Sequence, residues 1–354
     1  MESWTLAVDR TDLATAVLSP AEVPSPGEGE AVLRVERVGV TANNVTYAVL
    51  GDAFRYWEFF PAPPGWGHVP LWGFAVVSSS RASGVSEGQR VYGYLPPAGH
   101  LLVSPSRVDA RGFRDASPHR AGLPSPYNAY ALTTGDAAYE PEREDLQVLY
   151  RPLFFTSFML ADWLSDNGFS GADAVVVSSA SSKTAYGAAF LLRSSGRRLV
   201  GLTSPSNVTF TESLGVYDEV LPYESVEALP VVPSVYVDLA GSATLRASLR
   251  ARLGAALVAD VVVGITQQDA SPVGSLEGPR PQVFFAPDQM RKRSAEWGRD
   301  GLDERFGAAW RSFAPAVSGW VDVVPHSGPE ALRDVWLDVL AGRAKPRDGH
   351  VVTF

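Results

Sequence analysis

The spacing of hydrophobic residues changes about 150 residues into the chain. Before that point apolar and polar residues alternate over short stretches, such as residues 30–40, 74–80 and 90–95, which glycine, proline and serine separate. Alternation with a period of two is typical of half-buried strands. Short strands this close together predict a small barrel or sandwich in the first third of the chain.

In the middle of the chain the apolar positions first follow helical spacing and then form continuous runs. Residues 153–168 predict a helix, residues 173–179 a fully buried strand, residues 183–196 a second helix and residues 197–204 a second strand. The alternation continues to about residue 265. Strands and helices that alternate in this way predict a doubly wound parallel sheet, and the fold class is therefore α/β.

The remaining segments are less regular. Residues 282–293 predict a strand followed by the start of a helix, and residues 330–342 predict an amphipathic helix that ends at Gly342. Residues 108–150 are rich in proline, glycine, tyrosine and acidic side chains. We expect this stretch to link the two halves of the chain and to line a cleft between them.

The amino-acid composition excludes some classes of function. The 354 residues are 45% hydrophobic and 19% charged, as in a globular protein with a substantial core, and the net charge of −9 argues against general nucleic-acid binding. The N-terminus has no apolar signal core and no apolar run is long enough to cross a bilayer. We therefore expect a cytoplasmic protein without a membrane segment, which acts on a small-molecule substrate.

The chain also lacks the usual ligands of a catalytic metal. It contains no cysteine, and its five histidines are not paired at ligand spacing. No Gly-x-Ser-x-Gly motif for a serine nucleophile is present. The expectation is therefore an enzyme without a metal and without a serine or cysteine nucleophile.

The stretch DAVVVSSASSKTAYG, residues 173–187, has the order of a phosphate-binding turn but no glycine in the turn. A triphosphate loop would need glycine where Val177 and Ser182 stand, so that interpretation is disfavoured. In a dinucleotide turn, Ala185 can replace the last small residue. Serine hydroxyls, Lys183 and the helix N-terminus would then hold a diphosphate in place of bare backbone. Alternatively, the serines only cap the helix and no nucleotide binds.

The end of the second strand of this unit bears on the choice of cofactor. NAD sites usually place an acidic residue there for the ribose hydroxyls, but residues 203–207 contain none. Hydroxyl groups without a nearby acid suit a 2′-phosphate, which favours NADP(H), although an ordinary polar turn explains them equally well. The candidate cofactor-binding residues of both strand ends are Ser179, Ser181, Ser182, Lys183, Thr184, Thr203, Ser204 and Ser206.

Four stretches in a fixed order resemble a known family. They are GEGEAVLRVERVGV (27–40), EGQRVYG (87–93), TESLGVYDEVLPY (211–223) and LAGRAKPRDGHVVTF (340–354). Each is a weak motif, but their order resembles the medium-chain dehydrogenase/reductases, and among these the zinc-independent quinone and enoyl reductases. The glycine-free turn and RPLFFTSF (151–158) depart from the usual pattern and indicate a divergent branch.

The resemblance implies an architecture. Residues 1–150, completed by 286–354, would form a GroES-like barrel domain that carries the substrate site. Residues 151–285 would form a Rossmann-type dinucleotide-binding domain. Related reductases often form homodimers through an edge strand of the nucleotide domain, so the resemblance raises the same expectation here.

The resemblance also implies candidate catalytic and cofactor residues. Residues 43–68 correspond to a region that lines the substrate cleft, where a tyrosine can donate a proton; Tyr47 and Tyr56, together with Asn44, are the candidates. Thr156 falls close to the expected cofactor, and Phe285 could cover the nicotinamide ring. Core packing of the aromatic residues remains the alternative for each of them.

The leading hypothesis is a zinc-independent, NADPH-dependent oxidoreductase that reduces a carbonyl or an activated double bond of an apolar or acyl substrate. The alternative is a non-redox protein on the same scaffold. That protein would be a ligand-binding module, or a cofactor-free lyase or isomerase, which has lost dinucleotide binding.

Overall fold

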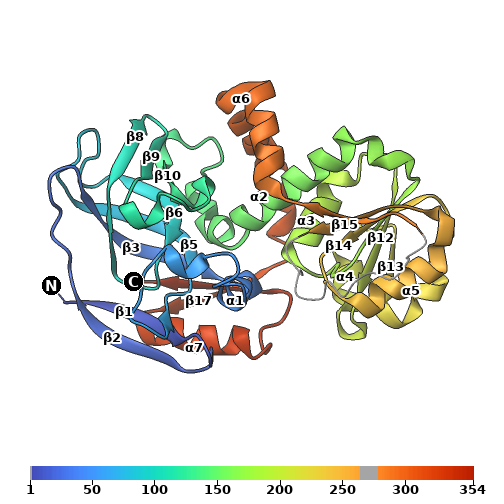
Figure 1. Ribbon diagram of the computed structural model, residues 1–354, viewed down its shortest axis with the longest axis horizontal. Helices are drawn as coiled ribbons and strands as arrows, with labels where there is room; N and C mark the ends of the chain where they lie inside the picture. The colour runs from blue at the N-terminus through green and yellow to red at the C-terminus, as the bar shows by residue number, and fades with distance from the viewer. Residues whose placement is uncertain (1, 264–277) are drawn as a thin grey trace. The chain divides into compact units, whose positions relative to one another are not determined.

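The computed structural model describes residues 2–263 and 278–354. The chain forms two compact units: unit 1 comprises Met1–Arg151 and Val321–Phe354, and unit 2 comprises Pro152–Trp320. Figure 1 shows both ends of the chain in unit 1.

Unit 1 contains most of the strands. Its helices are α1 (Ala42–Val49) and α7 (Pro329–Leu340). Its strands are β1 (Glu2–Asp9), β2 (Ala16–Glu22), β3 (Ala31–Val40), β4 (Trp66–Gly67), β5 (Leu71–Ser80), β6 (Arg90–Leu95), β7 (His100–Val103), β8 (Pro105–Asp109), β9 (Gly112–Asp115), β10 (Ala129–Leu132), β17 (Asp322–Ser327) and β18 (Asp348–Thr353).

The main sheet of unit 1 has the order β17-β18-β3-β5-β6-β10-β9-β8, and β7 also pairs with β3. A smaller sheet has the order β2-β1-β4. The alternation predicted for residues 30–40 forms β3, where a register shift between Val35 and Arg37 interrupts it. The apolar face of α7, including Leu332 and Val335, packs into the same core as β3.

Residues 108–150 are more regular than expected. They contain β9, β10 and the beginning of α2 (Glu144–Asp166), which starts well before the helix predicted from residue 153. Ion pairs hold this first turn of α2 on unit 1, since Glu144 pairs with Arg90 and Asp145 Oδ1 lies 2.6 Å from Arg37 Nη1. Leu146, Val148 and Leu149 of the same turns are also buried, and because they do not lie on one face of the helix, apolar spacing alone missed its start.

Unit 2 is built on a parallel sheet. Its strands are β11 (Ala174–Val177), β12 (Arg198–Thr203), β13 (Glu219–Pro222), β14 (Ser234–Asp238), β15 (Leu257–Val263) and β16 (Pro281–Phe284). Its helices are the later part of α2, α3 (Lys183–Leu192), α4 (Val208–Ser213), α5 (Ala243–Leu253) and α6 (Ala286–Val317).

The strand order in unit 2 is β13-β12-β11-β14-β15-β16, with parallel pairing throughout. Numbered along the chain, this is the order 3-2-1-4-5-6 of a Rossmann fold. The predicted doubly wound sheet is thus confirmed. Its topological switch point lies between β11 and β14, where Rossmann folds bind their ligands at the carboxyl ends of the strands.

Residues 286–320 belong to unit 2, whereas we expected the first unit to resume at residue 286. The reason is the length and packing of α6. Its Phe313 stacks on Phe154 of α2 with ring centroids 4.2 Å apart, and Arg293 Nε donates to Asp162 Oδ2 at 2.7 Å. The chain therefore returns to unit 1 only after this helix.

Candidate functional site at the carboxyl ends of β11, β12 and β14

The turn between β11 and α3, residues 178–182, forms without glycine. Ser179 adopts φ of +53°, a left-handed conformation that costs a residue with a side chain about 1–2 kcal/mol. Two hydrogen bonds offset this cost: Ser179 N donates to Tyr223 Oη at 3.1 Å, and Ser182 N donates to Ser179 O at 2.8 Å. Tyr223 opens a short 3-10 helix after β13 and so holds the turn from a neighbouring segment.

The turn leads directly into the N-terminus of α3. Ser182 caps this helix, because its Oγ accepts a hydrogen bond from Ala185 N at 3.3 Å. A Cβ on Gly187 would come within 2.7 Å of Ser157 Oγ, so α3 packs closely on α2. The side chains of residues 181–184 are partly exposed. A helix N-terminus with partly exposed hydroxyl and lysine side chains is a favourable place for an anion.

Hydroxyl and amide side chains gather at the carboxyl end of β12. Ser181 Oγ accepts hydrogen bonds from Thr203 Oγ1 and from Asn207 Nδ2, each at 3.2 Å. Ser204 Oγ lies 3.3 Å from Ser206 Oγ. The structure therefore brings Ser181 and Thr203 into contact as candidates for one site, and Ser204 and Ser206 form a second hydroxyl pair in the same turn.

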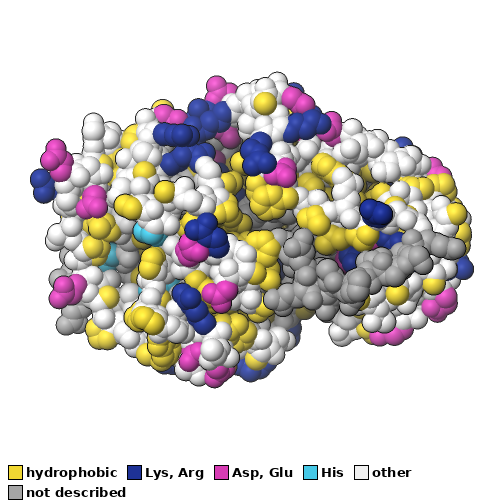
Figure 2. Space-filling view, in the orientation of Figure 1, with side chains coloured by type: hydrophobic (Ala, Val, Ile, Leu, Met, Phe, Trp, Pro, Cys, Tyr) yellow, Lys and Arg dark blue, Asp and Glu magenta, His cyan; other side chains and the backbone are white. Residues whose placement is uncertain are grey.

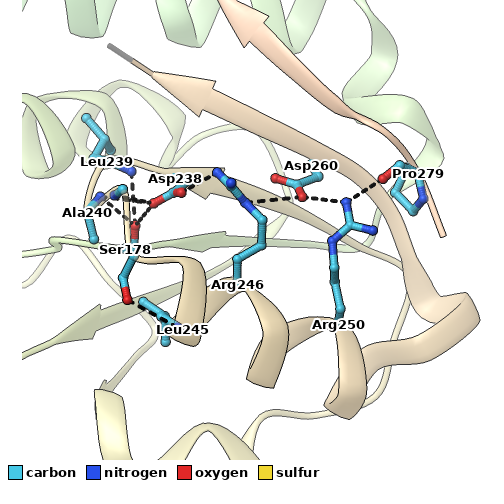
Figure 3. Close-up of polar contacts among 11 residues, drawn as sticks. Ser178, Asp238, Leu239, Ala240, Leu245, Arg246, Arg250, Asp260 and Pro279 are labelled. Atoms are coloured by element: carbon cyan, nitrogen blue, oxygen red, sulfur yellow. Dashed lines mark hydrogen bonds and ion pairs between the residues drawn. The ribbon is translucent and has the colours of Figure 1, made fainter. Parts of the chain in front are cut away.

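A buried carboxylate ties β14 to the same turn (Figure 3). Asp238 Oδ1 accepts hydrogen bonds from Ser178 Oγ at 3.0 Å and from Gly241 N at 2.9 Å. Ser178 Oγ in turn accepts from the backbone N–H groups of Leu239 and Ala240, both at 3.0 Å. Ser178 thus joins the two loops at the switch point of the sheet.

Asp238 is the first member of a buried ionic chain, which Figure 3 also shows. Arg246 pairs with Asp238, and its Nε lies 3.5 Å from Asp260 Oδ2. Arg250 Nη2 lies 2.7 Å from the same Asp260 oxygen and also donates to Pro279 O. Two carboxylates and two guanidinium groups balance in charge, which a buried arrangement requires.

Two tyrosine hydroxyls lie beside the turn. Tyr217 Oη donates to Ala180 O at 3.0 Å, and Tyr223 Oη accepts from Ser179 N. Burial raises the pKa of both Tyr217 and Tyr223 above the ordinary tyrosine value. Both hydroxyls are therefore protonated at neutral pH.

The two candidate catalytic tyrosines lie in an aromatic cluster of unit 1. Tyr47 is 5% exposed and accepts a hydrogen bond from Trp72 Nε1 at 3.0 Å. Its ring centroid lies 4.7 Å from that of Tyr56, and Tyr94 and Tyr127 pack beside them at 4.8 Å from each other. Burial raises the pKa of both Tyr47 and Tyr56, which keeps both hydroxyls protonated and able to donate.

Asn44 has a structural role. Its Oδ1 accepts from Thr41 N at 2.8 Å, and its Nδ2 donates to Pro70 O at 2.8 Å. The first bond belongs to the capping box of α1. The buried position of Asn44 is explained by this cap without any catalytic function.

Thr156 and Phe285 have no described contact with the turn. Thr156 Oγ1 donates to Pro152 O within α2 at 3.2 Å, and it is the next residue, Ser157, that donates to Thr184 O of α3 at 2.8 Å. Phe285 follows β16 and is 45% exposed, whereas its neighbour Phe284 is buried. An exposed ring at this position is available to a ligand.

Sequence reasoning found the serine and threonine residues of the turn but missed Ser178, Tyr217, Tyr223 and Asp238. Asp238 could have been found, because it ends a buried strand beside the switch point. The two tyrosines carry no such signal, since their contacts with the turn depend on how β13 and the segments around it pack.

Residues 2–263 and 278–354 contain no group of three or more histidine, aspartate or glutamate side chains that could hold a metal ion. Within the same residues, no helix combines the length and the apolarity that a membrane crossing requires. Acidic and basic side chains are interspersed on the face shown in Figure 2.

The fold is shared with solved reductase structures. CurA from Vibrio vulnificus in complex with NADPH is 14% identical, with 100% of this chain and 99% of that chain covered and a TM-score of 0.63. The quinone oxidoreductase from Coxiella burnetii is 13% identical, with 100% of each chain covered and a TM-score of 0.59. The CurK enoyl reductase is 14% identical, with 99% of each chain covered and a TM-score of 0.56.

These likenesses show the fold of the medium-chain dehydrogenase/reductases, with a GroES-like unit 1 and a Rossmann-type unit 2. No curated protein matches the chain in sequence. Residues 38–345 match the model of a family described as "Protein of unknown function (DUF2855)". Because this match spans most of the sequence, the chain belongs to the DUF2855 family.

Proposed function

We propose that this protein is a zinc-independent, NADPH-dependent oxidoreductase that reduces a carbonyl or an activated carbon–carbon double bond. The observation that carries the proposal is the arrangement at the switch point of unit 2. There the N-terminus of α3, with Ser182, Lys183 and Thr184, adjoins a strand end that has hydroxyl groups and no acid. CurA, which shares the fold, has been solved with NADPH.

The residues present fit a dinucleotide phosphate in chemistry and exposure. Ser182, Lys183 and Thr184 would hold the diphosphate at the start of α3, where the helix dipole favours negative charge. Ser204 and Ser206 would hold the 2′-phosphate. Ser179 contributes less directly, because its N–H already donates to Tyr223, whereas Ser181 Oγ accepts two hydrogen bonds within unit 2 and keeps its own O–H to donate.

Bound NADPH supplies the hydride, and the chain's own groups orient it and exclude water. Negative charge then develops on the substrate, and a protonated tyrosine hydroxyl is a suitable donor to it. Tyr47 and Tyr56 are our candidates for this role, since their rings lie together, with centroids 4.7 Å apart, in the segment that corresponds to the substrate cleft of the reductases. Thr156 and Phe285 are proposed to contact the nicotinamide half of the cofactor.

A second candidate function follows from the hydrogen bonds that the turn at residues 178–182 already makes within unit 2. Tyr223 accepts from Ser179 N, so one backbone donor that could have bound phosphate is used within the turn, and two hydrogen bonds to Ser181 Oγ fix that side chain in place. This favours a non-redox ligand-binding protein, or a cofactor-free lyase or isomerase, on the same scaffold.

The two functions are separated by an activity assay. Oxidation of NADPH is followed at 340 nm with a quinone, an aldehyde and an α,β-unsaturated ketone as acceptors. Acceptor-dependent oxidation that exceeds the rate without protein supports the reductase. Absence of oxidation with every acceptor, together with absence of NADPH binding by calorimetry, supports the non-redox function.

A further inference from the structure

A second candidate ligand site lies at the other end of the parallel sheet. A cavity of about 620 Å³ opens at the amino ends of β12 and β13, away from the turn at residues 178–182. One wall is formed by residues 193–199, between the end of α3 and the start of β12, and the other by residues 215–218 before β13. Its volume lies within the range of small-molecule sites.

Three arginines dominate the chemistry of this cavity: Arg193, Arg197 and Arg198. Arg198 Nη2 pairs with Glu219 Oε2 at 2.8 Å. Arg197 Nη1 lies 3.8 Å from Asp173 Oδ1, the outer limit of an ion pair, and its guanidinium lies over the ring of Phe169. The Arg197 side chain is 33% exposed, so its outer N–H groups are accessible to a further acceptor.

The arginines of the cavity differ in their acidic partners. Glu219 pairs with Arg198, Asp173 lies at the limit of an ion pair with Arg197, and Asp218 Oδ2 already accepts from Leu199 N at 2.7 Å. Arg193 pairs with no carboxylate among the described residues, so it is the arginine best placed to take an anion. Arginine is suited to oxyanions because its planar guanidinium can donate two parallel hydrogen bonds to phosphate oxygens.

We propose that this cavity binds the phosphate or diphosphate group of a small phosphorylated molecule, with Arg193 and Arg197 as the principal contacts. This site is separate from the turn at α3 and does not depend on the proposed reductase activity.

Tyr217 connects the cavity to that turn. Its ring forms part of the cavity wall and lies on Gly201, where a Cβ would come within 3.1 Å of Tyr217 Cδ1. Its hydroxyl donates to Ala180 O. An anion that changes the position of Tyr217 therefore changes the turn, and the structure assigns this site a regulatory effect on dinucleotide binding. This second step rests on the proposed function.

The binding step is tested by calorimetric titration of the full chain with inorganic pyrophosphate at fixed ionic strength. We expect one binding event, weakened about tenfold or more in Arg193→Ala and in Arg197→Ala. Arg343→Ala is the matched control, because that arginine is exposed and pairs with Asp338 in unit 1. Binding that both cavity variants leave unchanged, or that Lys183→Ala abolishes, overturns the proposal, as does equal weakening in all three arginine variants.

The coupling step is tested by titrating NADPH with and without saturating pyrophosphate. We expect the NADPH dissociation constant to change about fivefold or more in the wild type and to stay constant in Tyr217→Phe. The double variant Arg193→Ala/Arg197→Ala should also abolish the effect of pyrophosphate on NADPH binding. If pyrophosphate instead competes directly with NADPH at the α3 turn, the effect will remain in the double variant, and the coupling is refuted. If NADPH does not bind at all, the reductase proposal and its regulation fail together. The pyrophosphate titration still shows whether the cavity binds an anion.

Discussion

Ser178 donates a hydrogen bond to Asp238 Oδ1 across a distance of 3.0 Å, and this bond joins the two strand ends at which the sheet order reverses. The same Ser178 hydroxyl accepts from two backbone N–H groups of the loop after β14. One small side chain therefore sets the position of both loops that border the candidate cofactor site.

Asp238→Asn should destabilise the protein strongly. The change removes the charge of a buried carboxylate that pairs with Arg246, and breaking a buried pair costs about 3–5 kcal/mol; the lower end is expected because the Arg246 side chain is 21% exposed. Ser178→Ala should cost less, about 1.5–3 kcal/mol, because it removes a hydrogen bond to the Asp238 carboxylate and the acceptor of two backbone N–H groups without leaving a charge unpaired. Urea unfolding measures both. The control is Asp334→Asn in the exposed pair with Arg333, where a loss below ~1 kcal/mol is expected. If Asp238→Asn and Asp334→Asn lower the free energy of unfolding equally, the buried ion pairs around Asp238 do not stabilise the protein more than an exposed pair does.

Two buried tyrosines should respond in opposite directions to removal of the hydroxyl. Tyr94 Oη is buried and has no hydrogen-bond partner in the described part of the chain, whereas Tyr130 Oη donates to Tyr94 O at 2.7 Å and accepts from Arg120 Nη1. Tyr94→Phe should therefore raise the free energy of unfolding by about 1 kcal/mol, and Tyr130→Phe should lower it by about 1–3 kcal/mol. A loss of stability in Tyr94→Phe would mean that its hydroxyl bonds to a water or a ligand.

Stability should fall when the pH rises above about 10, the ordinary tyrosine pKa. Burial raises the pKa of Tyr130 to about 12, and burial also raises the pKa of Tyr94. Between pH 10 and 12 the unfolded chain loses protons that the folded chain keeps, so each such tyrosine lowers the free energy of unfolding by about 1.4 kcal/mol per pH unit. Its contribution is fully retained below pH 10.

The measurement is urea unfolding of the wild type and of Tyr130→Phe at several pH values from 8 to 12. The variant should lose stability less steeply between pH 10 and 12, since it has one titrating group fewer. If the free energies of unfolding of the two proteins fall in parallel between pH 10 and 12, the raised pKa of Tyr130 is contradicted.

Cofactor preference should change when an acid is placed at the carboxyl end of β12. Ser204→Asp would repel a 2′-phosphate and would accept hydrogen bonds from the ribose hydroxyls of NADH. We expect NADPH affinity to fall about tenfold or more and NADH affinity to rise, as measured by calorimetry. Ser213→Asp adds the same charge on the exposed end of α4 and should change neither affinity. An unchanged NADPH affinity in Ser204→Asp would show that the 2′-phosphate does not bind at this turn.

Much of the fold was predictable because burial imposes local patterns. β3, β6, β11 and β12 follow alternating or continuous apolar runs, and the structure places them within a few residues of the predicted bounds. The start of α2 was not predictable in this way, because its buried apolar residues Leu146, Val148 and Leu149 do not lie on one face of the helix. Ion pairs to Arg37 and Arg90 also hold its first turn. The length of α6 was also missed, although its second half carries a buried apolar stripe at helical spacing that the sequence displays: Leu302, Phe306, Trp310, Phe313 and Val317.

The candidate site was predictable only in part. Ser181, Ser182 and Thr203 follow buried strands, so their placement at one edge of the sheet follows from parallel topology. The left-handed turn at Ser179 gave no signal, since serine rarely adopts this conformation and Tyr223 supports it from elsewhere in the chain. The sequence also suggested a catalytic use for Asn44, which stays a prediction; the structure shows that this side chain caps α1, a role the sequence did not reveal.

The central claim is that the start of α3 holds the diphosphate of NADPH, and calorimetric titration of NADPH into three proteins tests it most directly. The account predicts one site per chain in the wild type, binding weakened about tenfold or more in Lys183→Ala, and unchanged binding in Lys345→Ala, which removes an exposed lysine of unit 1. No heat of binding at millimolar NADPH, or an affinity that Lys183→Ala leaves unaltered, would contradict it.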